Sequence, residues 1–405
     1  MKRLLLCAAL LCGAAQAADD AALLAKARAI HDKVLTIDTH VDIPFDFGDG
    51  YDMMKPGPRR QQVHLPTMQS GGLKAPFLIV FVEQEERTTA GYAHALSQAF
   101  NKFASIHKLT EQTYPEQIGL ALTSAEARRI AAGGKKVAFI GVENGYSMGK
   151  DLRLLDQFYD YGARYMGLVH NGHNDLGDSA QPKKNEPVAE WNGLSPLGKQ
   201  VVARLNELGI MVDVSHSSDK TTRDIIAASK VPVIASHSAV MGVSVHARNM
   251  SDTALEALGK AGGVIQIVAF DPYLTVTPPE KLAAIAALNK EMGVSGPGEV
   301  EKLPAEKLAT FEARMAEIQK KWPRSNVKNL VDHVDYAVKK IGIDHVGLAS
   351  DFNGGGGIDG WNNAGETLNV TLELVRRGYT EDQIAKIWGG NLLRVMDAVQ
   401  AARKK

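Results

Sequence analysis

Cysteine is almost absent from this chain, and the two that occur lie within its first twelve residues. They are Cys7 and Cys12, in a total of 405 residues. Both fall in a segment that has the pattern of a secretory signal peptide, with a basic start at Lys2 and Arg3, a short apolar stretch and a small-residue cleavage site. We therefore predict cleavage after Ala17 and export to the periplasm or the exterior.

The mature chain would then contain no thiol. This excludes disulfides, a cysteine nucleophile and cysteine-ligated zinc or iron–sulfur clusters. Any metal bound by the mature chain must use nitrogen and oxygen ligands.

The chain also has no excess of basic or acidic residues. The chain has 46 basic and 46 acidic residues, and removal of the signal leaves 44 against 46, a formal charge of −2. Such a balance is poorly suited to binding a phosphate backbone, so we expect no nucleic-acid partner. No second long apolar run occurs and the tail over 398–405 is polar and basic, so we expect no membrane anchor in the mature chain.

Short apolar runs that alternate with helical patterns indicate the fold. Continuous apolar character is typical of strands buried on both faces, as in parallel sheets. Eight such strands separated by helices predict a (β/α)8 TIM barrel. A doubly wound open sheet is the alternative, but no G-x-G-x-x-G follows the first run. The runs are 34–37, 77–82, 137–142, 164–169, 210–214, 231–235, 263–268 and 345–349.

Residues 1–17 are the predicted signal peptide, and residues 18–405 are predicted to form one barrel domain. A helical insertion over about 271–330 separates the seventh and eighth strands, and it contains a long charged amphipathic stretch from Pro304 to Trp322. Its charged faces are expected to be solvated, and a lid over the barrel is the weaker alternative. Further helices follow the last strand.

Polar residues gather where the predicted strands end. In a barrel of this type the chemistry lies at the C-terminal ends of the strands. One histidine at such a position is compatible with ordinary packing, but the whole set is hard to explain in that way. The set consists of His40, Asp42, Glu143, His170, His216, His237 and Asp351.

The types and spacing of these residues favour a metal centre. In His40-x-Asp42, residues two apart on a strand point to one face, so imidazole and carboxylate can converge on a divalent ion. Glu143 can bridge two ions, and His216 and His237 would complete a second position. Taken singly, each has a structural alternative: a surface pair, a helix-capping carboxylate or a hydrogen-bonded histidine.

Four residues are candidates for roles in the reaction itself. Asp351 could accept a proton from an activated water, and His170 could polarise a carbonyl or stabilise an oxyanion. His173 competes for the role of His170 but lies deeper in the loop. Arg248 could hold a substrate carboxylate through two parallel hydrogen bonds, although a plain surface arginine is the alternative.

These motifs together resemble the membrane (renal) dipeptidase family of zinc peptidases, which is related to the amidohydrolases. The resemblance extends over nearly all of the mature chain and depends on the order and spacing of the pieces. They are Asp38–Pro44, Gly141–Gly145, Leu168–Asn171, Gly193–Gly198, Asp213–His216, Val233–Ser238, Arg248–Asn249, Gly347–Phe352 and Asn391–Val395.

The resemblance implies two Zn²⁺ ions, bridged by Glu143 and by a water or hydroxide that attacks the peptide bond of a small dipeptide. Its ligand sets would be His40, Asp42 and Glu143 for one ion and Glu143, His216 and His237 for the other. It also implies that His170 contacts the scissile carbonyl, that Arg248 binds the C-terminal carboxylate and that Asp351 shuttles the proton.

Family members differ in specificity, so D-residues at the C-terminal position and some β-lactams are further expected substrates. The sequence leaves a non-covalent homodimer open. Unlike the mammalian relatives, this chain shows neither a lipid-anchor signal nor a mature cysteine.

Two other functions are compatible with the sequence. A deaminase or lactonase of the amidohydrolase type often has a carboxylated lysine as its bridge, but no lysine ends the fourth strand and Glu143 is available instead. A non-catalytic periplasmic binding protein could also use a barrel, because fold does not determine function. It would need neither a two-metal ligand set nor Asp351.

Overall fold

The computed structural model describes residues 19–45, 47–48, 52–55, 61–295, 300 and 303–404. The predicted signal peptide over 1–17 lies outside the described residues and stays a prediction.

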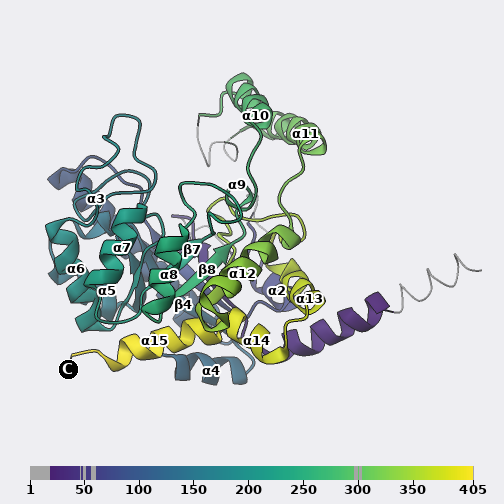
Figure 1. Cartoon of the computed structure of the whole chain (residues 1–405), viewed down its shortest axis with the longest axis horizontal. Helices are drawn as coiled ribbons and strands as arrows, with labels where there is room; N and C mark the ends of the chain where they lie inside the picture. Colours follow the sequence, from purple (N-terminus) through teal and green to yellow (C-terminus); the bar gives the residue numbers. More distant parts are fainter. Residues whose placement is uncertain are drawn as a thin grey trace, which may run out of the picture.

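Eight parallel strands follow one another in sequence order around a nearly closed barrel, which confirms the predicted (β/α)8 fold. Figure 1 shows strands β4, β7 and β8 among the surrounding helices. A ninth short strand, β3, pairs with β4 away from this path. The strands are β1 Ile37–Asp42, β2 Ala75–Phe81, β3 Ile118–Leu120, β4 Lys136–Glu143, β5 Ala163–Gly167, β6 Met211–Asp213, β7 Ile234–Ser238, β8 Val264–Val268 and β9 Val346–Ala349.

The first and last strands meet at a seam. The backbone N–H of Asp351 donates to the carbonyl oxygen of His40 at 3.0 Å, and that of Asp42 donates to Phe352 at 2.9 Å. The two ends of a chain segment more than 300 residues long are therefore joined beside the predicted site residues.

Helices cover the outside of the barrel, and several begin at a serine that caps the first turn. The side chains of Ser195, Ser218 and Ser251 each accept a hydrogen bond from a backbone N–H three residues on. A first helix spans 19–33. The others are α2 Leu65–Gly71, α3 Thr89–Lys108, α4 Ser124–Ala132, α5 Arg153–Asp160, α6 Pro196–Leu208, α7 Asp219–Ala228, α8 Asp252–Lys260, α9 Asp271–Leu274, α10 Pro279–Met292, α11 Ala305–Lys321, α12 Val327–Ile341, α13 Leu368–Arg376, α14 Glu381–Ala385 and α15 Asn391–Ala401.

The predicted runs 34–37 and 231–235 both end several residues before the strands that the structure shows. The structure begins β1 at Ile37 and continues it through His40 and Asp42, and β7 includes His237. Polar residues extend these strands because the neighbouring backbone continues to pair with them, as in the register Asp42 with Ile79. These side chains therefore project from the rigid ladder, not from the loops beyond it.

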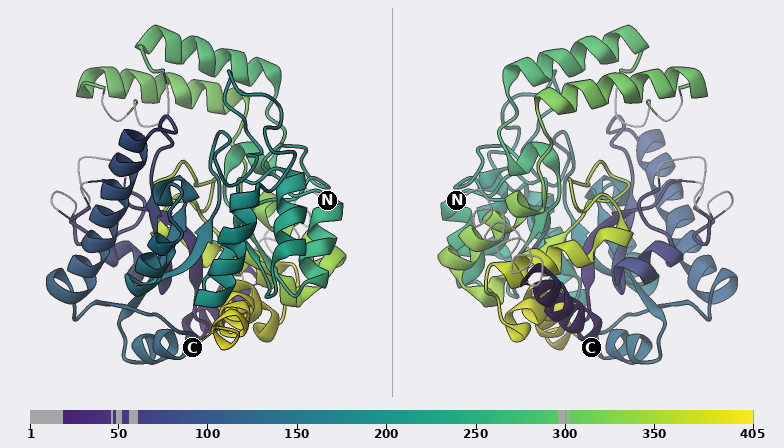
Figure 2. Two further views of the ribbon diagram at one scale, coloured as in Figure 1. Left: turned by 90° about the vertical axis from the view of Figure 1, so that its left-hand side faces the viewer. Right: turned by 90° about the vertical axis from the view of Figure 1, so that its right-hand side faces the viewer.

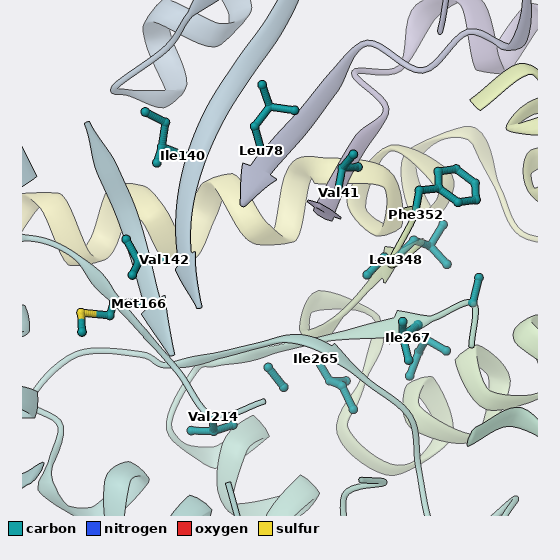
Figure 3. Close-up of a cluster of buried hydrophobic side chains, with 14 of the residues drawn as sticks. Val41, Leu78, Ile140, Val142, Met166, Val214, Ile265, Ile267, Leu348 and Phe352 are labelled. Carbon is teal, nitrogen blue, oxygen red and sulfur yellow. The ribbon is translucent and has the colours of Figure 1, made fainter. Parts of the chain in front are cut away.

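Alternation along the strands divides the core into two layers. On β2, Phe77 and Ile79 belong to an inner cluster, where Phe77 stacks on Phe139 with ring centroids 4.6 Å apart. The intervening residue Leu78 belongs to the cluster between strands and helices, which Figure 3 shows around the barrel. Strands with both faces buried explain why the sequence shows continuous apolar runs.

One end of the barrel is closed by the C-terminal helix. Leu392, Met396 and Val399 of α15 share a buried cluster with Ala75 and Val264, the first residues of β2 and β8. Figures 1 and 2 show α15 across this end and the pair α10 and α11 beyond the opposite one. The C-terminal ends of the strands are thus the end at which a site can form.

The helical segment between the seventh and eighth barrel strands contains α10 and α11. Their contact has a small core of its own around Leu288, Val294 and Phe311. The pair projects from the body of the molecule in Figure 2. Among the described residues, no helix combines the length and apolarity needed to cross a membrane.

Candidate active site

Three imidazoles converge on Glu143, the last residue of β4. Oε1 of Glu143 lies 3.2 Å from Nε2 of His216 and 3.4 Å from Nε2 of His237, and these two nitrogens are 3.0 Å apart. The other oxygen, Oε2, lies 3.5 Å from Nε2 of His40. Each carboxylate oxygen thus faces a different group of nitrogens.

His40 brings two further carboxylates into the site. Its Nε2 lies 3.6 Å from Oδ2 of Asp42 and 4.0 Å from Oδ1 of Asp351 across the seam. All of these side chains are buried or nearly so. Residues from β1, β4 and the end of β9 therefore meet at one point of the barrel rim.

Tyr165 of β5 determines which nitrogen of His40 faces the site. The Tyr165 hydroxyl donates its single proton to the Thr39 carbonyl at 3.0 Å, so it can only accept from Nδ1 of His40, also at 3.0 Å. Nδ1 then carries hydrogen, and Nε2 turns toward Glu143. A hydrogen bond of this kind behind an imidazole is typical of metal ligands.

Ser236 determines which ring nitrogen of His237 faces the site. Its Oγ donates to Oδ2 of Asp213 at 2.7 Å and accepts from Nδ1 of His237 at 2.8 Å. Burial holds the pKa of His237 well below its usual range, so the ring is neutral and its Nε2 presents a lone pair to the site.

Two buried carboxylates hold the strand ends in register. Oδ1 of Asp38 accepts the backbone N–H groups of His40 and Ser350, and Oδ1 of Asp213 accepts those of Ser215 and Ser236. Each carboxylate thus ties its own strand to another strand of the barrel.

Backbone strain is concentrated in the same place. His216 and Asp351 have φ of 66° and 58°, in the left-handed region that residues other than glycine seldom adopt. Such a conformation costs about 1 to 3 kcal/mol and is common at functional sites. The barrel rim therefore holds both side chains in positions that a relaxed backbone would not give.

Burial and neighbouring charges shift the pKa values of the site residues. Although burial opposes ionisation, His40 and His170 hold the pKa of Glu143 well below its usual range. Burial, together with the charges of Asp42 and Glu143, raises the pKa of Asp351 well above its usual range. Burial likewise holds the pKa of His216 far below the usual value. A neutral His216 beside an ionised Glu143 is the pair of protonation states that a metal requires. Although burial opposes it, Glu143 and Asp42 raise the pKa of His40 well above its usual range.

The donor set fits divalent metal ions. Among the described residues, Oε1 of Glu143 accepts no hydrogen bond although two imidazole nitrogens lie within 3.4 Å. Lone pairs that face a carboxylate need a cation between them. Ligand atoms lie within 4.8 Å of one another in three groups: His40, Glu143 and His237; Glu143, His170 and His216; and His40, Asp42 and Asp351. The last two groups include His170 and Asp351, which the sequence had placed outside the ligand sets.

Arg248 lies next to this cluster, in the loop after β7. Its side chain is buried, with the guanidinium 5.4 Å from the ring centroid of Tyr273. Nη2 donates to the carbonyl of His237 at 3.3 Å, whereas Nε has no acceptor in the part of the chain that the structure describes. A buried donor without an acceptor is a place where an anion can bind.

The geometry distinguishes the two loop histidines. Nδ1 of His173 accepts the backbone N–H of Ser179, and its Nε2 lies 2.9 Å from the carbonyl of Pro187, so both nitrogens serve the loop. The His170 ring lies 4.2 Å from that of His216, and burial lowers the pKa of His170. His170 therefore remains the candidate for contact with a substrate.

Sequence reasoning missed the supporting residues. Asp38 and Asp213 could have been found, because each precedes a strand-end histidine by two or three residues. Tyr165 could not, because it stands in an apolar run and looks like an ordinary core aromatic.

Comparison with known proteins agrees with this geometry. The family model described as membrane dipeptidase, peptidase family M19, matches residues 24–405. The chain is 31% identical over 304 residues to the dipeptidase verJ of Clonostachys rogersoniana, covering 74% of this chain and 64% of the relative. It is 29% identical over 343 residues to the dipeptidase tcpJ of Claviceps purpurea, covering 84% and 69%.

A solved structure is similar over almost the whole chain. The probable dipeptidase PvdM from Pseudomonas aeruginosa has 35% sequence identity and a TM-score of 0.82, covering 94% of this chain and 99% of that one. A metallopeptidase from Rhodobacter sphaeroides shares the fold at 20% identity and a TM-score of 0.71, covering 90% and 99%. With a family match over nearly its entire length, the chain belongs to the membrane dipeptidase family, peptidase family M19, and is a metal-dependent dipeptidase.

Proposed function

We propose that the chain hydrolyses dipeptides with two zinc ions, the first held by His40, Asp42 and Glu143 and the second by Glu143, His216 and His237. The observation that carries this proposal is the placement of the two carboxylate oxygens of Glu143, one facing His40 and the other facing His216 and His237. Ions bound there would polarise the peptide carbonyl and make a water molecule acidic near neutral pH.

The surrounding residues supply the rest of the chemistry. Asp351 takes the proton of the attacking water at a carboxylate oxygen and returns it to the leaving nitrogen as the C–N bond breaks. Its buried carboxyl has a raised pKa, which suits a group that must hold a proton and then release it. His170 donates a hydrogen bond to the carbonyl oxygen as negative charge develops there.

Arg248 selects the length of the substrate. In the part of the chain that the structure describes, Nε of this buried arginine has no acceptor and Nη2 donates to the His237 carbonyl. The guanidinium would bind the C-terminal carboxylate of a dipeptide through two parallel hydrogen bonds. A longer peptide would place a neutral peptide group there and leave the guanidinium without its anion.

The stereochemistry of the C-terminal residue is part of the proposal. The Rhodobacter sphaeroides metallopeptidase was crystallised with a phosphinate mimic of the dipeptide L-Ala-D-Ala. We include D-residues at that position and penem-type β-lactams among the proposed substrates, and we propose that the protein acts after export.

The test combines metal analysis with a substrate panel. Purified protein should contain up to two zinc ions per chain and should hydrolyse L-Ala-L-Ala and L-Ala-D-Ala better than their amides or a tripeptide. Arg248→Ala should reduce kcat/KM for dipeptides roughly 100-fold, because a buried charged hydrogen bond is lost, and should affect the amides much less.

Arg153→Ala is the matched control, since the Arg153 side chain is 89% exposed. A protein that stays inactive on every dipeptide after zinc is added would exclude the proposed reaction. Equal losses on acids and amides in Arg248→Ala would exclude the carboxylate role alone.

A further inference from the structure

Lys102, on α3, is a buried cation that no carboxylate contacts in the part of the chain that the structure describes. Its residue is 3% exposed, and its Nζ lies 4.5 Å from the ring centroid of Phe45 and 5.7 Å from that of Phe81. Within the described ranges, this ammonium has neither a hydrogen-bond acceptor nor an ion-pair partner. Lysines are almost never buried in this way unless they are paired, so the ammonium group needs an explanation.

The ammonium group lies beside the active site. Phe81 is the last residue of β2, and its ring lies 4.6 Å from the ring of His170. Burial lowers the pKa of Lys102 to about 8, and the carboxylates of Asp42 and Glu143 oppose that effect. Nζ is therefore close enough to the site for its charge to be felt there, while it contacts none of the site's carboxylates.

Lys102 and Arg248 lie on opposite sides of the barrel. Phe81 ends the second strand in the barrel order, and Arg248 follows β7, the sixth. In a ring of eight strands these positions are half a turn apart. An extended dipeptide spans about 7 Å, so one whose carboxylate is at Arg248 directs its N-terminal residue across the site toward Lys102.

We propose that Lys102 binds an acidic side chain on the N-terminal residue of the substrate, which makes the enzyme selective for glutamyl and aspartyl dipeptides. This inference rests on the proposed function, because Arg248 sets the direction of the substrate. A carboxylate reaching Lys102 would give the buried ammonium an acceptor, beside the rings of Phe45 and Phe81 that it already contacts. A neutral side chain would leave the ammonium unpaired.

The test compares L-Glu-L-Ala with L-Gln-L-Ala, which differ only in charge at the side-chain end. The zinc-loaded wild type should favour the glutamyl substrate roughly 10- to 100-fold in kcat/KM, the range expected for a charged hydrogen bond in a buried site. Lys102→Met should bring the ratio of the two kcat/KM values close to one, mainly through KM. Lys102→Arg should keep most of the preference.

Lys136→Met is the matched control. Lys136 is the first residue of β4, at the end of the barrel away from the site, and burial lowers its pKa to about 8 as well. This variant should keep the wild-type ratio.

The outcomes are separable. A wild type that hydrolyses both substrates equally overturns the role of Lys102. This result needs no variant, so it stands even if Lys102→Met fails to fold. A wild-type preference that survives in Lys102→Met also overturns it. A wild type that hydrolyses neither substrate contradicts the proposed function itself.

Discussion

Removal of the Tyr165 hydroxyl should weaken metal binding without touching a ligand. Tyr165→Phe keeps the ring, which is fully buried, but leaves Nδ1 of His40 without its acceptor and the Thr39 carbonyl without the hydroxyl donor. With no solvent at this position, each of the two orphaned groups costs about 1 to 3 kcal/mol, so the unfolding free energy of the metal-free protein should fall by about 2 to 6 kcal/mol.

The effect on the metal is separate. Nothing then holds the His40 ring with Nε2 toward Glu143, and loss of such a supporting hydrogen bond typically weakens metal binding about 10- to 100-fold. Competition with a chromophoric chelator measures the affinity, and denaturant unfolding of the metal-free protein measures the stability.

Tyr161→Phe is the control, since Tyr161 is exposed and should change neither quantity. If Tyr165→Phe bound zinc as tightly as the wild type, the inference that Tyr165 sets the orientation and tautomer of His40 would be refuted.

Two further changes test the proton chemistry and the pH dependence of stability. Asp351→Asn should retain bound metal but lose about 100- to 10,000-fold in kcat, because the amide cannot carry the proton; full turnover would refute its role as a shuttle. Burial lowers the pKa of His31 from 6.5 to about 4, although it is hydrogen-bonded to Thr371 and Gly71. The unfolded chain therefore binds the extra proton first, and the unfolding free energy should fall by up to about 3 kcal/mol as the pH drops from 6.5 to 4. His31→Gln should remove that part of the slope in pH-dependent urea unfolding, and an unchanged slope would assign the effect to other groups.

The sequence predicted the barrel because its strands are buried on both faces and so appear as separate apolar runs. It predicted the position of the site because polar residues at the strand ends, such as Glu143 and His170, interrupt an otherwise apolar pattern. The same reasoning placed the ends of β1 and β7 too early, because a change from apolar to polar residues was taken as the end of each strand.

Other features depend on partners distant in sequence. Tyr165 and His40 are 125 residues apart, and nothing near Tyr165 marks it as other than a core residue. Lys102 stands in a helix of mixed character, where a lysine normally reaches solvent. Only the packing of α3 against the rim shows that its side chain is buried.

The seam between β1 and β9 has a consequence for the order of events during synthesis. His40 and Asp42 are made near the beginning of the chain, but Asp351, which joins them in the site, is made more than 300 residues later. The hydrogen bonds that join Asp351 to His40 and Phe352 to Asp42 form only when the last strand has been added. Closing so long a loop is slow relative to local folding. A chain that ends before Asp351 therefore lacks both the complete cluster and the closed barrel around it, so catalytic competence is acquired only after all eight barrel strands have been translated.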